Sequence, residues 1–239
     1  MVEDPFVVLR EGAVARIVLN RESEGNALTR GMMRDLSARI SELGDDAAVH
    51  VVVLEARGPQ FCRGRDGKGE SRAGLKPHEV WSQMMGAVLG VYQAIGAAPI
   101  PVVARLQGDA IGFGAALAIG CDVTLATEQC RLSLPEIEHG IPPTLAISAA
   151  LGKVPVKALS YLVYSAEPVD ATRAVQLGMV SKTYPAGDFE AGSMQFVRGL
   201  AERPRLVLET IKRYMTKAPE LSPAMASEYA GILLAVVRS

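Results

Sequence analysis

Two glycine-rich turns give this sequence its clearest potential for chemistry. The first, Gly-Asp-Ala-Ile-Gly-Phe-Gly at residues 108–114, follows a β-branched run and opens an apolar helix of small residues. The second lies in residues 58–74, which are rich in glycine and arginine. Turns of this kind present backbone N–H groups that have no acceptor inside the helix that follows. Two such turns that meet can hold a carbonyl oxygen while it becomes an enolate.

Glu136 is the carboxylate that best complements such a pair of donors. It stands between Pro135 and Ile137, just past a short run that predicts a strand. A carboxylate beside an enolate can take and return the proton of the neighbouring carbon if an apolar environment raises its pKa. Turns often carry an acid, so composition alone favours a solvated turn residue or a helix cap here. Residues 58–74 likewise have an ordinary alternative, a solvated surface loop.

Other sites built on glycine turns fit the sequence poorly. A dinucleotide fingerprint needs a small residue where this chain has Leu117, and an acid about twenty residues further on. Gly-Lys-Gly at residues 67–69 lacks the first glycine and the Ser or Thr of a P-loop. The three histidines are scattered, and neither His-Glu-x-x-His nor Gly-x-Ser-x-Gly occurs. A nicotinamide enzyme on a Rossmann domain is therefore a weaker hypothesis, and zinc or serine hydrolysis has little support.

Composition narrows the class of protein and its partners. The 239 residues, 49% of them hydrophobic, are enough for one large domain with a substantial core. The 25 basic and 26 acidic residues form no long basic block, so we expect neither nucleic acid nor a membrane as partner. The sequence shows no signal peptide or spanning segment, which predicts a cytoplasmic protein. Three cysteines without Cys-x-x-Cys spacing are expected to be buried free thiols, with no metal site.

Alternating strands and helices must position the two turns. Strands are expected at residues 6–9 and 14–19 as a hairpin, and at 49–54, 101–106, 122–126 and 180–184. A helix from Thr29 is expected to end at a Gly44 cap, and a second, over residues 78–95, to carry Trp81 and Tyr92 in a core-facing stripe. Fully apolar strands between helices favour a parallel sheet covered by helices.

In order and spacing, these segments resemble the crotonase superfamily, the enoyl-CoA hydratase and isomerase family. The similar segments, within about residues 20–185, are Phe-Cys-Arg-Gly-Arg-Asp at 61–66, the turn at 108–114, Cys-Asp at 121–122, Pro-Glu-Ile at 135–137 and Ala-x-x-Ala-x-x-x-Gly-Met-Val at 171–180. The resemblance implies an α/β fold, a crotonase-like spiral of ββα units over residues 1–185. A C-terminal helical trimerisation region would follow over residues 186–239, giving a homotrimer or a dimer of trimers.

The same resemblance implies roles for individual residues. The backbone N–H groups of Arg65 and Phe113 would form the oxyanion hole, and Glu136 would be the catalytic acid and base. Substrate-binding positions would be Arg63, Gly64, Asp66, Lys68, Gly112, Ala116 and His139. The substrate would be a coenzyme A thioester, an acyl-CoA, with no permanently bound cofactor. By residue type alone, Asp66 is a better helix cap than catalyst.

Two residues depart from the family pattern. Phenylalanine stands at position 113, where the family usually has glycine, and Ala116 stands where two-acid hydratases carry a glutamate. A single acid can still shuttle a proton in isomerisation or activate water, as in the feruloyl-CoA hydratase-lyases, which resemble this chain in Gly-Ile-Pro-Pro at 140–143. The sequence therefore predicts a single-glutamate enoyl-CoA hydratase, with a hydratase-lyase, an isomerase or a non-catalytic CoA-thioester-binding paralogue as alternatives. Other candidate acids, none favoured, are Asp109, Glu138, His139 and Tyr229.

Overall fold

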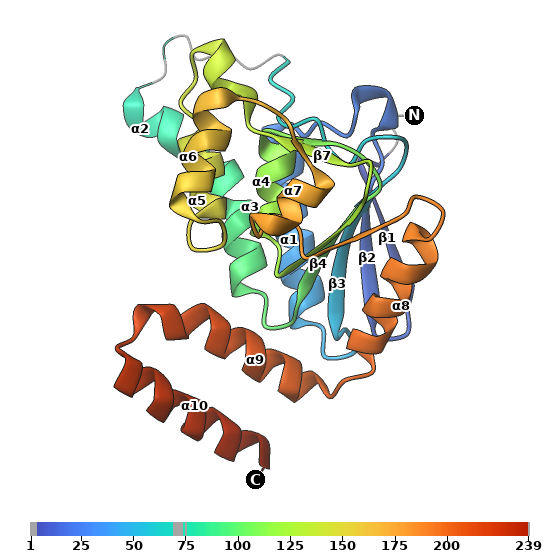
Figure 1. Cartoon of the computed structure of the whole chain (residues 1–239), viewed down its shortest axis with the longest axis vertical. Coiled ribbons are helices and arrows are strands. Elements are labelled where there is room, and N and C mark those ends of the chain that lie inside the picture. The colour runs from blue at the N-terminus through green and yellow to red at the C-terminus, as the bar shows by residue number, and fades with distance from the viewer. Residues whose placement is uncertain (1–3, 69–73, 75, 239) are drawn as a thin grey trace.

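A six-stranded sheet forms the centre of the computed structural model, which describes residues 4–68, 74 and 76–238 (Figure 1). Its strands, in spatial order, are β1 (Phe6–Glu11), β2 (Val14–Leu19), β3 (Val51–Ala56), β4 (Val102–Leu106), β6 (Val123–Thr127) and β9 (Lys182–Tyr184). All neighbours are parallel except the predicted hairpin β1–β2. A second, three-stranded sheet contains β5 (Ala110–Ile111), β7 (Arg131–Ser133) and β8 (Val169–Asp170). In this small sheet, β5 leads directly into Gly112 and Phe113, and β7 leads into the turn that contains Glu136.

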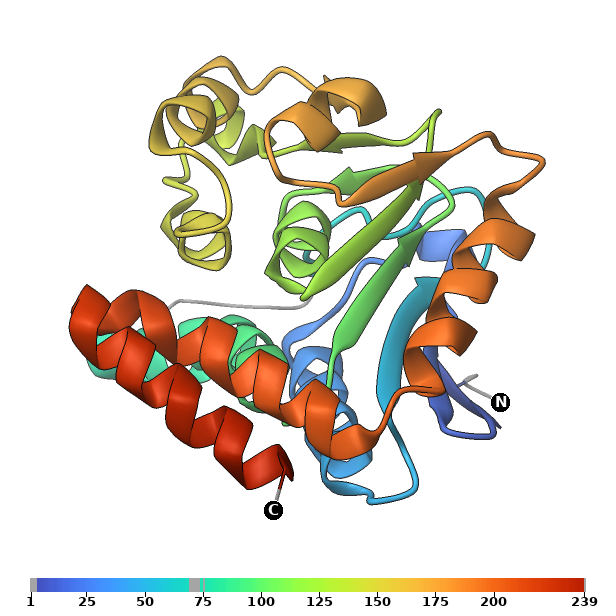
Figure 2. The same cartoon turned by 60° about the horizontal axis from the view of Figure 1, so that its bottom comes forward.

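Helices cover both faces of the large sheet (Figures 1 and 2). Helices α1 (Arg30–Asp45), α3 (Gly86–Ala97) and α4 (Phe113–Gly120) share the larger core, and α8 (Phe189–Ala201) packs on the opposite face in a smaller one. Alternate residues of a strand point to opposite faces. In β3, Val52 and Leu54 accordingly join the larger core, whereas Val51 and Val53 join the core under α8.

The other long helices follow α4 in the chain. They are α5 (Thr144–Ala150), α6 (Val156–Ser165), α7 (Ala171–Gln176), α9 (Arg205–Lys217) and α10 (Pro223–Arg238). The short helical segments are α2 (Pro77–Val80), a π-helical turn (Trp81–Met85) and 3₁₀ turns at Glu22–Glu24, Pro135–His139 and Ala218–Glu220. Helices α9 and α10 project from the sheet as a hairpin (Figure 1). The buried Lys212 amino group fastens α9 to the core through the Ile95 and Ile100 carbonyls, at 2.7 and 3.0 Å, and the Asp122 carboxylate at 2.7 Å.

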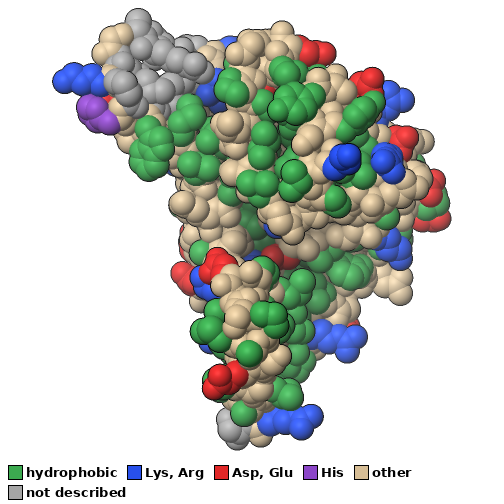
Figure 3. All heavy atoms as spheres, turned by 60° about the vertical axis from the view of Figure 1, so that its left-hand side comes forward, with side chains coloured by type: hydrophobic (Ala, Val, Ile, Leu, Met, Phe, Trp, Pro, Cys, Tyr) green, Lys and Arg blue, Asp and Glu red, His purple; other side chains and the backbone are tan. Residues whose placement is uncertain are grey.

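The C-terminal hairpin exposes many apolar side chains, and Figure 3 shows hydrophobic side chains along this part of the molecule. The exposed apolar residues of α9 and α10 are Leu206, Ile211, Met215, Met225, Ile232, Leu234 and Val236. Helix α8, in contrast, belongs to the packing of the sheet through Phe189, Met194 and Val197. The division of the chain after residue 185 stays a prediction.

Two predictions made from helical periodicity are wrong. Gly44 does not end α1 but lies inside it, with Asp46 as the C-cap. A Cβ on Gly44 would lie 3.3 Å from the Ala98 Cβ, so the glycine serves close packing. Trp81 is 63% exposed, because the π-helical turn that it begins interrupts the 3.6-residue period on which the stripe was based.

The three thiols agree with expectation: Cys62, Cys121 and Cys130 are free and buried. Burial raises the pKa of each to about 12, so none is a ready nucleophile at neutral pH.

Among the described residues, every helix is too short or too polar to cross a lipid bilayer. In the same residues, no group of three or more His, Cys, Asp or Glu side chains is placed to hold a metal ion.

Candidate active site

The two glycine turns that the sequence singles out lie side by side and are joined by backbone hydrogen bonds. The N–H groups of Phe61 and Cys62 both donate to the Asp109 carbonyl, at 3.0 and 3.3 Å. The Ile111 N–H donates in return to the Cys62 carbonyl at 2.9 Å, and Cys62 forms an isolated parallel bridge with Ala110. Because both donors and acceptors are backbone groups, this arrangement depends little on side-chain identity.

Two glycines permit this contact because the backbones approach too closely for a side chain. A Cβ on Gly108 would lie 1.9 Å from the Pro59 carbonyl oxygen. A Cβ on Gly114 would lie 2.2 Å from the Cys62 carbonyl oxygen. Both distances are far below van der Waals contact, so a larger residue at either position would push the turns apart.

Gly64 lies directly against the start of α4. Its φ is +105°, and a Cβ there would lie 3.0 Å from the Ile111 carbonyl oxygen and 3.6 Å from the Phe113 nitrogen. Phe113 is the first residue of α4, so its N–H has no acceptor within the helix and lies at the positive end of the helix dipole. Arg65 follows Gly64 and forms a parallel bridge with Leu28. The structure thus brings the backbone around Arg65 to that of Phe113, while the roles of their N–H groups stay predictions.

The Glu136 carboxylate lies against the same turn. A Cβ on Gly112 would be 3.0 Å from the Glu136 Oε1. Gly112 is the N-cap of α4, with a φ of +54°, and its N–H donates to the Ser133 carbonyl at 2.8 Å. Ser133 ends β7, and Glu136 follows in the 3₁₀ turn, so the parallel pairing of β5 with β7 places the carboxylate beside the N-terminus of α4.

The environment of Glu136 suits proton transfer. Its Oε2 is buried and has no hydrogen-bond partner among the described residues. Burial raises the pKa of the Glu136 carboxyl, and its own backbone N–H and the positive charge of His139 offset part of that rise. A carboxyl whose pKa moves toward neutrality can act both as base and as acid in one catalytic cycle.

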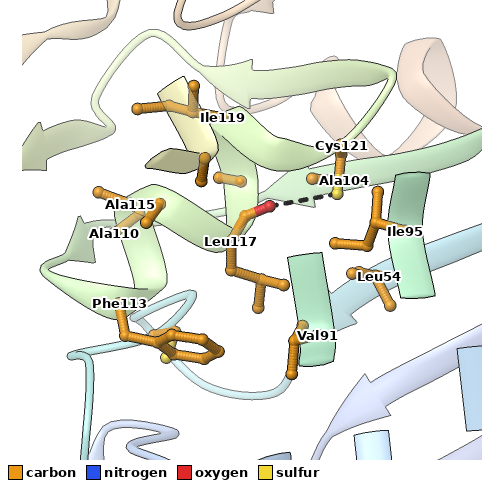
Figure 4. Close-up of a cluster of buried hydrophobic side chains, with 14 of the residues drawn as sticks. Leu54, Val91, Ile95, Ala104, Ala110, Phe113, Ala115, Leu117, Ile119 and Cys121 are labelled. Carbon is orange, nitrogen blue, oxygen red and sulfur yellow. Dashed lines mark hydrogen bonds between the residues drawn. The ribbon is translucent and has the colours of Figure 1, made fainter. Parts of the chain in front are cut away.

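An aromatic pair lies next to this carboxylate. The Phe113 ring stacks on that of Tyr92 in α3, with centroids 6.0 Å apart and planes inclined by 23°. Figure 4 draws Phe113 in the same buried cluster as Leu117 and Val91, and the side chain is 6% exposed. Burial and the negative charge of Glu136 both raise the pKa of Tyr92, so the phenol keeps its proton at neutral pH.

The family of the chain follows from its sequence as a whole. Residues 10–231 match the protein-family model described as Enoyl-CoA hydratase/isomerase. The chain belongs to this family. Enoyl-CoA hydratase/isomerase family enzymes use CoA thioester substrates and need no permanent cofactor, which confirms the predicted family and substrate class.

Named relatives of this hydratase/isomerase chain agree with that assignment. It is 27% identical over 225 residues to the mitochondrial enoyl-CoA hydratase domain-containing protein 3 of Danio rerio, covering 93% of this chain and 76% of that protein. It is 28% identical over 223 residues to the 2,3-dehydroadipyl-CoA hydratase of Escherichia coli K12, covering 91% and 84%. The crystal structure of an enoyl-CoA hydratase from Mycobacterium smegmatis matches with a TM-score of 0.91 at 28% identity, covering 98% and 91%. The predicted crotonase-like α/β fold is therefore confirmed.

Within this family fold, some of the predicted site residues lie close together at the N-terminus of α4, and others lie in neighbouring turns. Gly64, Gly112, Phe113 and Glu136 are brought together, as described above. Ala116 is fully buried in the first turn of α4, where its N–H donates to the Gly112 carbonyl at 3.0 Å. His139 is exposed at the end of the 3₁₀ turn that carries Glu136. The predicted cluster thus has a compact centre at the N-terminus of α4.

The predicted binding residues Arg63, Asp66 and Lys68 lie in the segment that follows β3 and precedes α2. Arg63 is exposed, with its Cδ against Gly25. Asp66 accepts from the Lys68 N–H at 3.1 Å and pairs with the Arg21 guanidinium at 3.2 Å. Asp66 is therefore not a helix cap: in the described ranges the next helix begins at Pro77, and the short carboxylate holds a local turn instead.

Tyr92, which stacks on Phe113, is the residue beside this candidate site that sequence reasoning did not single out. Periodicity assigned it to a core-facing stripe, and nothing in a single sequence tells a packed tyrosine from one beside a carboxylate. The other candidate acids have ordinary surroundings: Asp109 accepts from the Arg131 N–H at 2.9 Å, Glu138 is exposed, and the Tyr229 ring lies 6.2 Å from that of Tyr214 in the C-terminal hairpin.

Proposed function

We propose that the protein is a hydratase-type lyase that adds water to the double bond of an enoyl-CoA thioester. The backbone N–H groups of Arg65 and Phe113 hold the thioester oxygen, and Glu136 moves the proton. One observation carries this proposal: the half-buried Glu136, whose buried Oε2 has no hydrogen-bond partner among the described residues, lies against Gly112, the residue that immediately precedes Phe113. The family supports the hydratase-like activity, and the residue roles are ours.

In this reaction Glu136 starts as the base. It accepts a proton from water as the water oxygen bonds to the β-carbon, and the electrons of the double bond move to the thioester oxygen. The two N–H donors stabilise the resulting enolate more than the neutral thioester, because they are already fixed in place when its charge develops. Glu136 then returns the proton to the α-carbon, and its raised pKa favours both steps.

The remaining predicted residues have binding roles in this proposal. Arg63, Gly64, Asp66 and Lys68 lie along the CoA, and the turn of Gly112, with Ala116 and His139, borders the acyl group. The apolar faces of α9 and α10 would be covered by other subunits in a homotrimer or a dimer of trimers. The cytoplasmic location also stays a prediction, and the relative from Danio rerio is named as mitochondrial.

Replacement of Glu136 by glutamine tests the proposal. The variant keeps the shape of the side chain and loses the base, so hydration and exchange of the α-proton with solvent deuterium should both fall by about 10²- to 10⁴-fold. Calorimetric binding of a saturated acyl-CoA should be unchanged, because the contacts to CoA remain. Full activity in Glu136→Gln would overturn the assignment.

A non-catalytic CoA-thioester-binding protein is the second candidate. Ala116 favours it, since a fully buried methyl group stands where two-acid hydratases carry a glutamate. This candidate predicts that the wild-type protein binds acyl-CoA without α-proton exchange. A panel of enoyl-CoA thioesters, including 2,3-dehydroadipyl-CoA, separates the catalytic alternatives when hydration, double-bond migration and chain cleavage are scored as three products.

A further inference from the structure

We infer that the Tyr92 phenol is the second protic group of the proposed active site, where it orients the water that Glu136 activates. This role rests on the proposed hydration reaction and assigns to it a residue on α3, outside the segments that resemble the family motifs. Tyr92 would act by holding the water and would remain protonated throughout.

The position of Tyr92 along α4 is the first support. Its ring stacks on Phe113 at the first residue of that helix, with centroids 6.0 Å apart. A Cβ on Gly120, near the other end, would lie 3.9 Å from the Tyr92 Cδ1. Residues three and four apart share one face of a helix, so residues 113, 116 and 120 line the same side. The Tyr92 ring therefore runs beside Ala116.

Ala116 supplies the second support. It is fully buried and ends in a methyl group, so position 116 itself offers no polar atom to a substrate or water. The small side chain leaves the adjacent space to its neighbours, and the Tyr92 ring, which carries a hydroxyl, runs along this side of α4. A half-buried tyrosine usually turns its hydroxyl toward a polar partner or water.

The electrostatic influence of Glu136 on Tyr92 is the third support, beside the packing of the ring on α4. The negative charge of Glu136 is the second largest cause, after burial, of the raised pKa of Tyr92. Glu136 in turn has a buried Oε2 with no hydrogen-bond partner among the described residues. We place the water of the proposed reaction between the phenol and the Glu136 carboxylate.

The proposed step balances without a change in the protonation of Tyr92. The water donates one hydrogen to the Glu136 carboxylate and the other to the Tyr92 oxygen, which leaves an oxygen lone pair free for the β-carbon. As the C–O bond forms, the first proton moves to Glu136 and the double-bond electrons move to the thioester oxygen. The second hydrogen stays on the product hydroxyl.

Tyr92→Phe is the decisive variant because it keeps the ring and its stacking on Phe113. Two rates are measured on the same protein: kcat for hydration of an enoyl-CoA, and exchange of the α-proton of a saturated acyl-CoA with solvent deuterium. Exchange uses Glu136 and the two N–H donors but no added water. We expect kcat for hydration to fall by about tenfold or more, as for the loss of one hydrogen bond in the transition state, with exchange and KM unchanged.

Tyr184→Phe is the matched control. Tyr184 is a buried tyrosine that likewise packs on a phenylalanine, Phe189, with ring centroids 6.3 Å apart, but it lies in the core under α8. The Tyr184→Phe variant should leave the rates of hydration and of α-proton exchange unchanged. Hydration at the wild-type rate in Tyr92→Phe, or equal loss of hydration and exchange, would overturn the role of the phenol. Absence of both reactions in the wild-type protein would instead overturn the proposed function.

Discussion

A Cβ on Gly112 would lie 3.0 Å from the Glu136 Oε1, so the half-buried carboxylate and the N-cap of α4 are in contact. The carboxylate comes from the turn after β7 and the N-cap from the turn after β5. Their parallel pairing makes the distance between base and helix N-terminus a property of the backbone. Changes at Gly112 should therefore affect catalysis more than changes at other glycines with a positive φ.

Gly112→Ala should reduce hydration by about 10²-fold or more, because the new methyl group displaces the carboxylate. It should also cost about 1–3 kcal/mol in unfolding free energy, since Gly112 has a φ of +54° and a ψ of −120°, which side chains other than that of glycine disfavour. Gly12→Ala is the control: Gly12 has a φ of +56° and open space around its Cβ position. Urea unfolding should show a loss of stability in both variants, with activity reduced in Gly112→Ala alone. Equal activities would contradict the contact.

Phe113→Pro should remove one oxyanion donor without breaking α4. Proline lacks an N–H and is tolerated at the first position of a helix, which Phe113 occupies. Removal of one such donor typically costs about 10²- to 10³-fold in kcat. Phe113→Ala, which keeps the N–H and loses the ring, is the matched control and should retain much more activity. The proposed donor would be wrong if the two variants had equal kcat values and equal helix content by circular dichroism.

His139→Ala should move the acid limb of the pH–rate profile to higher pH. The positive charge of His139 partly offsets the rise that burial causes in the pKa of Glu136. Without that charge the pKa of the Glu136 carboxyl should rise further. The ionised form, which hydration needs as the base, should then be reached only at higher pH. The measurement is kcat/KM against pH, with His50→Gln as control, since His50 bonds to the Ala201 carbonyl on α8. A shift to lower pH would contradict the assignment.

Glu136→Gln should stabilise the protein at high pH. The folded-state pKa of Glu136 is raised, so the unfolded chain loses this proton at lower pH than the folded one. The stability of the wild-type protein therefore falls as pH rises from the ordinary carboxyl pKa through the raised one. Thermal unfolding should show a higher Tm for Glu136→Gln at pH 8 and no gain at pH 4. Glu138→Gln, an exposed change in the same turn, should show no such pH dependence.

Much of the site was predictable because it consists of backbone turns with distinctive glycines. Residue type alone indicates the turn at residues 108–114, the segment that contains Gly64 and Glu136 as a complementary carboxylate, and the family resemblance implies their roles. Tyr92 was not predicted, because a helical stripe indicates burial and not which polar neighbour lies nearby. Gly44 and Trp81 were misplaced for a related reason, since the approach of Ala98 and a π-helical turn are tertiary or local features that periodicity does not encode.

The alternation along β3 also bears on where the chain can be shortened. Val51 and Val53 face α8, which contributes Phe189, Met194 and Val197 to that core. Without α8, this row of β-branched side chains would be exposed to water as an apolar sheet surface of the kind that binds other chains. A fragment that stops at residue 185 would therefore precipitate and not persist as a smaller enzyme. Helix α8 protects the solubility of the fold, although it contributes none of the residues that we place in the site.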